Sequence, residues 1–249
     1  MIVIPMAGLS SRFKKEGFEL PKYMLIAHGQ SLFHHSVASF KRYFNDQSFL
    51  FICLNVFDTP DFIHSECEKL GLKHFQIVAL DQPTKGQAET VYLGLQSAKI
   101  NDNEPLVIFN IDTFRPNFIF PKDFDIHQVD GYLETFIGSG ENWSNVLPAG
   151  PGSNKVSMTA EKQQISEYCC TGLYVWKNAS LFNRIFEQCL SEFNENASGE
   201  LYVAPMYNHL INEGGDIRFS VVAKDEVIFC GVPSEYYEFL NTQNSLTKD

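Results

Sequence analysis

The chain has 249 residues, of which 44% are hydrophobic and 20% are charged, and its formal net charge is -11. This length and composition suit one large globular domain and exclude a disordered or fibrous chain. The acidic excess disfavours sequence-independent binding to nucleic acid, and apolar runs such as residues 49–54 are far shorter than the roughly 20 residues that span a bilayer. The six cysteines have neither zinc-ligand nor disulfide-framework spacing, so we expect a reduced, cytoplasmic protein.

The first half of the sequence alternates short apolar runs with amphipathic stretches. The apolar start has no basic leader-like region, so we expect it to be the first strand. Ser31 is expected to cap one helix, and Thr59 with Pro60 to begin the next, which Gly71 ends. Strands are expected at residues 2–5, 48–54, 75–80 and 106–109, and helices at 31–44, 59–70 and 86–98. This order is typical of a parallel sheet with helices on both faces.

Beyond Asp112 the alternation breaks. Polar, turn-rich stretches at 138–143 and 148–154 separate expected strands near 131–137 and 171–176. Further helices are expected at 180–193, capped by Asn178, and at 202–211, ended by Gly214. We find neither a repeat nor a linker, and therefore expect one continuous domain over residues 1–249, with two lobes that divide near residue 115.

The loop after the first expected strand has the features of a phosphate site. Ligands of open parallel sheets bind beyond the carboxyl ends of the strands. The small residues of Met6-Ala7-Gly8-Leu9-Ser10-Ser11 let backbone N–H groups approach a ligand, and Arg12 and Lys22 add two cations. The loop matches neither the Walker A pattern nor the dinucleotide pattern G-x-G-x-x-G. By itself, a plain turn with two solvated cations explains it as well.

Two further loops at the same sheet edge carry polar groups. The strand at 106–109 leads to Asp112, and one carboxylate there suits Mg²⁺, which fills the rest of its shell with water and phosphate. The alternative is an aspartate that begins a turn. Before the helix at 86–98, the amides of Gln82 and Gln87 can both donate and accept, which reading a nucleobase edge requires.

The order of these motifs resembles that of the sugar-phosphate nucleotidyltransferases (nucleotide-sugar pyrophosphorylases), in a short single-domain form. The resemblance spans nearly the whole chain. It implies an α/β, Rossmann-like nucleotide-diphospho-sugar transferase fold, with a mixed, mostly parallel central sheet and helices on both faces. The segments that carry it are Ala7-Gly8-Leu9-Ser10-Ser11-Arg12, Pro21-Lys22-Tyr23-Met24-Leu25 with Gly29, Glu161-Lys162, Ile165-Ser166, Thr171-Gly172-Leu173-Tyr174 and Gly199-Glu200-Leu201-Tyr202.

The resemblance also implies an activity. The enzyme would transfer a nucleoside monophosphate from a nucleoside triphosphate to a phosphorylated acceptor, with a sugar 1-phosphate expected, and release pyrophosphate for surface polysaccharide biosynthesis. Arg12 and Lys22 would be catalytic, and Asp112 would bind Mg²⁺ or Mn²⁺. The nucleotide-binding lobe, about 1–115, would contribute Met6, Ala7, Gly8, Ser10, Ser11, Gln82, Gly86 and Gln87, and the acceptor-binding lobe, about 116–249, Glu161, Lys162, Gly172 and Glu200.

The sequence departs from the family's pattern at two places. The loop lacks a second glycine, and Phe229 stands where many members carry an aspartate that is the second metal ligand. Asp225, water or phosphate could complete the metal's shell instead. Three alternatives stay open: a cytidylyltransferase for a small non-sugar phosphate, a nucleotide-sugar-dependent glycosyltransferase, and a non-catalytic nucleotide-binding regulatory protein. Neither a nucleic acid nor a membrane is an expected partner, and self-association into a homo-oligomer is left open.

Overall fold

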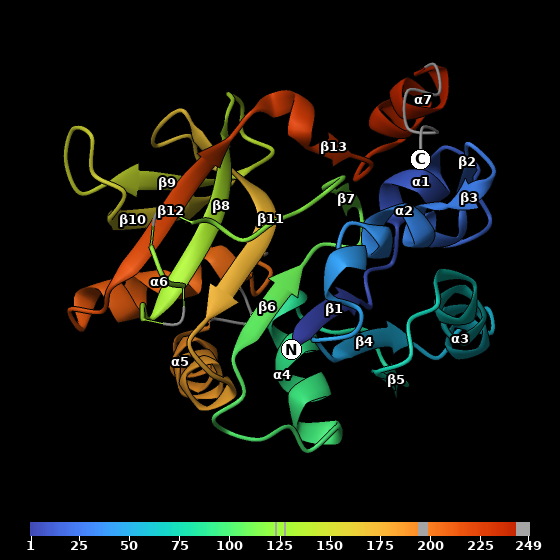
Figure 1. Cartoon of the computed structure of the whole chain (residues 1–249), viewed down its shortest axis with the longest axis horizontal. Coiled ribbons are helices and arrows are strands. Elements are labelled where there is room, and N and C mark those ends of the chain that lie inside the picture. The colour runs from blue at the N-terminus through green and yellow to red at the C-terminus, as the bar shows by residue number, and fades with distance from the viewer. Residues whose placement is uncertain (123, 127, 194–198, 243–249) are drawn as a thin grey trace.

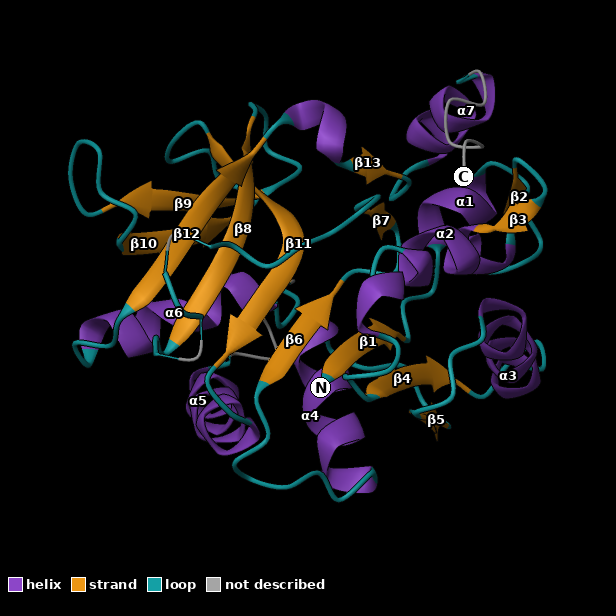
Figure 2. Cartoon of the chain, viewed as in Figure 1, coloured by secondary structure: helices purple, strands orange, loops and turns teal. Residues whose placement is uncertain are grey.

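The computed structural model of the chain describes residues 1–122, 124–126, 128–193 and 199–242. A nine-stranded sheet runs through it (Figures 1 and 2), in the order β10-β9-β11-β6-β1-β4-β5, with β8 paired to β11 and β12 paired to β8. Its strands are β1 (Ile2–Met6), β4 (Phe49–Leu54), β5 (Phe75–Leu80), β6 (Leu106–Phe109), β8 (Gly131–Ile137), β9 (Ser144–Pro148), β10 (Val156–Glu161), β11 (Tyr168–Trp176) and β12 (Ile217–Val222).

The first half of the chain builds a parallel sheet, as its pattern predicts. Strand β1 lies between β4 and β6 and pairs in parallel with both, and β4 pairs in parallel with β5. Every residue of β1 and β4 is buried, so these strands are covered on both faces. The second half differs because β11 runs antiparallel to β6, β8 and β9, while β12 pairs in parallel with β8 in the same sheet.

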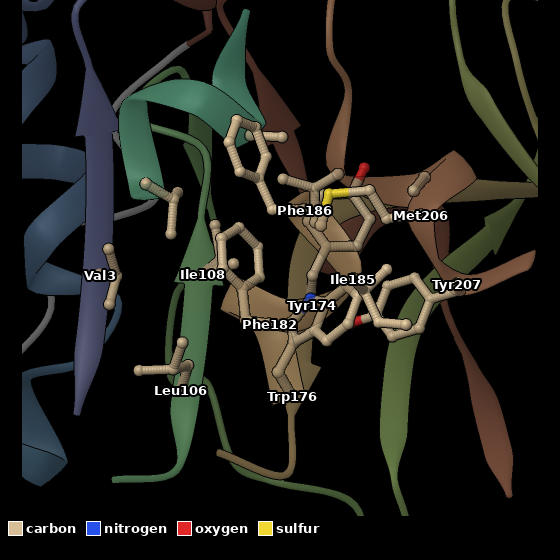
Figure 3. Packing of buried hydrophobic residues seen from close by; sticks show 14 of the residues in the cluster. Val3, Leu106, Ile108, Tyr174, Trp176, Phe182, Ile185, Phe186, Met206 and Tyr207 are labelled. Atoms are coloured by element: carbon tan, nitrogen blue, oxygen red, sulfur yellow. The ribbon is translucent and has the colours of Figure 1, made fainter. Parts of the chain in front are cut away.

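Two cores cover the two faces of the sheet. Successive side chains of a strand point to opposite faces, and Val3 accordingly belongs to one core while Ile2 and Ile4 belong to the other. The first core, part of which Figure 3 shows around Ile108 and Trp176, is covered by helices α4, α5 and α6, and the second by α2 and α3. These helices are α2 (Leu32–Ala38), α3 (Thr59–Leu70), α4 (Gln87–Ser97), α5 (Ala179–Glu192) and α6 (Val203–Asn212).

The expected caps are largely confirmed. The Ser31 hydroxyl accepts from the backbone N–H of His34 and caps α2, and the Asn178 side chain caps α5 in the same way. Gly71 ends α3 with a φ of 74°. Two expectations need correction. The N-cap of α3 is Asp58, one residue earlier than expected. Helix α2 ends at Ala38, because the backbone N–H groups of Ser39 and Phe40 bond to carbonyls three residues back, and a 3₁₀ turn, η2 (Lys41–Tyr43), follows.

The C-terminal segment returns to the N-terminal half. Strand β13 (Ile228–Phe229) pairs antiparallel with β7 (Thr113–Phe114), and helix α7 (Pro233–Asn241) lies beside α1 (Ser11–Lys15) and the hairpin of β2 (Ile26–Ala27) and β3 (Gln30–Ser31), as Figure 1 shows. Buried Phe13 and Phe239 belong to one small cluster there. Two 3₁₀ turns complete the elements, η1 (Lys22–Met24) and η3 (Lys224–Glu226). Over the described residues, we find no helix with the length and apolar character that crossing a membrane requires.

Candidate active site

A cavity of about 590 Å³ lies at the carboxyl ends of β1 and β6 and collects segments from both halves of the chain. One of the residues proposed from the sequence, Gln82, is exposed and does not line the cavity. Of the residues proposed from the sequence, the lining includes Met6, Ala7, Gly8, Ser10, Ser11, Arg12, Lys22, Gly86, Gln87, Asp112, Glu161, Lys162, Gly172 and Glu200.

The loop after β1 is held in shape by its own backbone and by Lys22. Ser10 has a φ of 52°, in the left-handed region, and its carbonyl accepts from the backbone N–H of Lys14 in α1. The Ser10 hydroxyl accepts from the backbone N–H of Lys22 at 3.2 Å. Buried Phe13 anchors α1, which leaves Arg12 exposed at the cavity. The loop and the Lys22 segment are therefore one unit.

Lys22 and Asp112 form an ion pair in the cavity. Pro21 precedes η1, and the Lys22 ammonium donates to a carboxylate oxygen of Asp112 at 2.5 Å. Both side chains are 20% exposed, so the pair is partly shielded from water while a ligand in the cavity can reach it. The carbonyl of Asp112 accepts from the N–H of Cys230, which ties the turn after β6 to the C-terminal segment.

The segment before α4 is held by close backbone contact. Gly86 has a φ of 147°, and a Cβ there would lie 2.5 Å from the backbone nitrogen and oxygen of Leu201. Backbone hydrogen bonds join Leu201 to residues 85 and 88 on either side. Gln87 begins α4, and its amide donates to Asn110 at 2.5 Å. Gly172 makes room for Asn110, because a Cβ at Gly172 would lie 2.5 Å from the amide nitrogen of Asn110.

The polar residues expected to face the acceptor lie together at the other side of the cavity. The Glu161 carboxylate accepts from the Ser144 hydroxyl, and burial raises the pKa of Glu161. The Lys162 ammonium lies 4.6 Å from the ring centre of Tyr202, donates to its hydroxyl, and is 3.9 Å from a carboxylate oxygen of Glu200. Sequence reasoning missed Tyr202 as a site residue, although it directly follows the Gly199-Glu200-Leu201 segment.

The C-terminal segment closes the cavity with aromatic and acidic groups. Phe229 lines the cavity, with its ring centre 4.5 Å from that of Trp143. Asp225 is exposed on η3 and does not line the cavity. Glu235, farther along this segment, does line the cavity, and its carboxylate accepts from the backbone N–H groups of Gly231 at 2.8 Å and Val232 at 3.2 Å. Burial, and then the nearby charge of Asp112, raises the pKa of Glu235.

The donor set of the cavity suits a particular kind of metal ion. The described residues hold no group of three histidine, cysteine, aspartate or glutamate side chains that could bind a metal by themselves. A zinc-type site made by protein alone does not fit them. Mg²⁺ usually takes one or two carboxylates and completes its shell with water and substrate phosphates, and Asp112 in this cavity fits that arrangement.

A comparison with known proteins identifies the family of this chain. No protein-family model and no curated protein matches the chain. Among solved structures, the nucleoside-diphosphate-sugar pyrophosphorylase from Vibrio cholerae RC9 is 50% identical, has a TM-score of 0.90, and matches over 97% of this chain and 100% of that chain.

More distant structures share the fold. The inositol-1-phosphate CTP transferase from T. maritima is 15% identical with a TM-score of 0.72, over 96% of this chain and 94% of that chain. A UDP-glucose pyrophosphorylase is 14% identical with a TM-score of 0.71, over 96% of both chains. The fold class expected from the sequence is confirmed. Because 50% of the residues are identical to the V. cholerae protein over nearly the full length of both chains, this chain belongs to the nucleoside-diphosphate-sugar pyrophosphorylase family of nucleotidyltransferases.

Proposed function

We propose that the protein transfers a nucleoside monophosphate from a nucleoside triphosphate to the phosphate of a sugar 1-phosphate and releases pyrophosphate. The observation that carries the proposal is the Lys22–Asp112 ion pair, which lies in a cavity lined by both the loop after β1 and Glu161 with Lys162. The family of the 50% identical relative supports nucleotidyl transfer to a phosphorylated acceptor.

The reaction needs positioning and charge neutralisation more than acid–base chemistry. An oxygen of the acceptor's phosphate attacks the α-phosphorus, and the bond from that phosphorus to the bridging oxygen breaks as pyrophosphate leaves. The nucleophile is already an anion, so no general base is required. Catalysis then depends on in-line alignment and on cations that offset the charge of the phosphates.

The cavity offers cations at two positions for this purpose. Arg12, exposed on α1, is assigned to the departing β and γ phosphates, and Lys22 to the α phosphate and the incoming oxygen. The small residues Gly8 and Ser10 leave room for phosphates against the loop's backbone. The Lys22–Asp112 contact compensates both charges within the cavity.

Asp112 is the residue that we assign to the divalent ion. When bound there, Mg²⁺ or Mn²⁺ would supply positive charge that offsets the negative charge of the phosphates. The ion pair with Lys22 orients the Asp112 carboxylate, and the hydrogen bond from the Cys230 N–H to the Asp112 carbonyl fixes the turn that carries it.

The remaining assignments concern recognition. We assign the base to the segment before α4, where the Gln87 amide is oriented by Asn110; the exposed Gln82 would have to reach it from outside the cavity. We assign the acceptor to Glu161, Lys162, Gly172 and Glu200, which all line the cavity. Residues about 1–115 thus bind nucleotide and about 116–249 bind acceptor. We also propose that the enzyme is cytoplasmic, with which its free cysteines are consistent, and that its product serves surface polysaccharide biosynthesis.

A pyrophosphate-release screen tests the proposal. The four ribonucleoside triphosphates and dTTP are combined with sugar 1-phosphates and small non-sugar phosphates, with Mg²⁺ or Mn²⁺. We expect release with one triphosphate and one sugar 1-phosphate, and a fall on the order of 10²- to 10³-fold in Lys22→Ala and Asp112→Ala. Lys15→Ala, which removes an exposed cation of α1 outside the cavity, is the matched control and should remain active.

Two results would contradict the proposal. Triphosphate binding without pyrophosphate release for any acceptor would indicate a nucleotide-binding protein that does not catalyse transfer. Release that is insensitive to the loss of Lys22 and of Asp112 would show that the chemistry takes place elsewhere.

A further inference from the structure

We propose that Trp143 and Phe229 form an aromatic platform in the acceptor subsite, on which the C–H face of a pyranose ring stacks. The inference rests on the proposed function and adds the feature that selects a sugar among phosphorylated acceptors. It also gives a role to Phe229, the residue that departs from the family's metal-binding pattern.

The two rings form a rigid surface of the cavity. Trp143 and Phe229 are half-buried, both line the cavity, and their ring centres are 4.5 Å apart with the ring planes inclined at 56° to each other. A pyranose ring therefore stacks on the face of one ring and contacts the edge of the other. Phe136 is buried behind them, with its ring centre 5.1 Å from each. Because the rings are already held by this packing, a ligand that stacks on them would lose little affinity to side-chain ordering.

The platform lies between the reacting groups and the polar acceptor residues. Phe229 pairs with Thr113 in the β13–β7 ladder, and Thr113 directly follows Asp112 in the sequence. On the other side, the carbonyl of Trp143 accepts from the backbone N–H of Lys162 at 3.1 Å. A molecule whose phosphate is near Asp112 and whose polar groups reach Lys162 would therefore pass over the two rings.

A pyranose has the chemistry that this arrangement recognises. Its hydroxyl groups can bond the carboxylates and the ammonium of Glu161, Lys162 and Glu200, while the C–H groups of one face carry partial positive charge and suit the negative face of an aromatic ring. A quaternary ammonium group is instead bound by a cage of aromatic rings. Here Phe136 is buried against the other two rings and does not line the cavity, so two inclined rings face the ligand and do not surround it as a cage would.

Tryptophan fluorescence gives a readout that does not depend on turnover. The chain has two tryptophans, and Trp176 is fully buried in the core, so a ligand in the cavity reports through Trp143. Glucose 1-phosphate, galactose 1-phosphate and N-acetylglucosamine 1-phosphate are titrated, with inorganic phosphate and phosphocholine as comparisons. We expect saturable quenching by at least one sugar 1-phosphate, at concentrations where inorganic phosphate and phosphocholine give none.

Variants separate stacking from folding. In Trp143→Ala and Phe229→Ala, we expect the KM of the acceptor sugar to rise about tenfold, with nucleotide affinity unchanged. Trp143→Phe keeps an aromatic face and should stay within about threefold of the wild type. The matched control is Tyr237→Ala on α7, an exposed aromatic residue that does not line the cavity.

The outcomes distinguish this proposal from the proposed function. An unchanged KM in both alanine variants, or pyrophosphate release with phosphocholine and with no sugar 1-phosphate, would overturn the platform and leave nucleotidyl transfer in place. Quenching of Trp143 by a sugar 1-phosphate without pyrophosphate release from any triphosphate would support the platform and contradict the proposed function.

Discussion

Replacing Gly86 by alanine tests whether close backbone contact shapes the nucleotide side of the cavity. The new Cβ would lie 2.5 Å from both the nitrogen and the oxygen of Leu201, and the φ of 147° belongs to a region that glycine alone adopts readily. Both contact atoms are backbone, so no side-chain rotation relieves the clash. Either Gly86 or the Leu201 segment must move. Gly86 itself lines the cavity, and Leu201 lies between two lining residues, Glu200 and Tyr202.

The expected loss in the free energy of unfolding follows from the backbone conformation of residue 86 and from its contact with Leu201. A residue held in such a backbone region costs about 1–3 kcal/mol, and the contact with Leu201 adds to that cost. We expect Gly86→Ala to lower the free energy of unfolding by at least about 2 kcal/mol. With a urea dependence of about 2 kcal/mol per molar, the midpoint of unfolding would fall by roughly 1 M. Triphosphate affinity should fall as well, because Gln87 directly follows.

Urea unfolding of two matched variants tests whether the contact with Leu201 destabilises Gly86→Ala. Gly8→Ala is the control, since it makes the same substitution in the other loop of the cavity, where a Cβ would meet nothing within 4 Å. Where the backbone is compatible, alanine for glycine is neutral to stabilising by up to about 1 kcal/mol. If Gly86→Ala were no less stable than Gly8→Ala, the argument from backbone contact would be refuted.

Three further perturbations have expected outcomes. Lys22→Met should lower kcat/KM on the order of 10²- to 10³-fold while the urea midpoint stays near that of the wild type; full activity would contradict the assigned role. Glu134→Gln leaves the buried guanidinium of Arg115 without its carboxylate, and should lower the free energy of unfolding by about 3–5 kcal/mol; a loss below about 1 kcal/mol in urea would contradict this. Burial opposes ionisation of Glu66, but hydrogen bonds from Lys69 and a serine hydroxyl outweigh it and lower the pKa of Glu66. Its carboxylate therefore stabilises the fold above the unfolded-state pKa, and this contribution is lost as the pH falls through the folded-state pKa. Glu66→Gln should accordingly lose less stability than the wild type between pH 7 and about 3, and an equal or larger loss in urea titrations at each pH would contradict the assignment.

Local sequence patterns determined the architecture of the first half. The apolar runs of β5 and β6 and the amphipathic α3 can be placed from the sequence to within a residue, because an apolar run bounded by polar residues and the helical spacing of apolar residues are both local patterns. Strand β6 is buried throughout, whereas β5 at the sheet edge is only partly buried. The same order of strands places the loops that carry Lys22 and Asp112 at one sheet edge, because parallel strands share the edge where their carboxyl ends meet. Their prediction as site residues depended on that order and on the family resemblance.

Only the tertiary structure decided which distant segments meet. Strand β12 pairs with β8, and β13 with β7, across long stretches of chain, and the short strands β9 and β10 had no pattern strong enough to predict them. These pairings bring Phe229 to Trp143, Tyr202 to Lys162 and Glu235 into the cavity. The physical reason is that strand pairing and aromatic packing depend on cross-strand neighbours and burial more than on local propensity. The polar residues Lys22 and Asp112 of the cavity could therefore be predicted along the chain, whereas the aromatic platform of Trp143 and Phe229 forms only once the chain has folded.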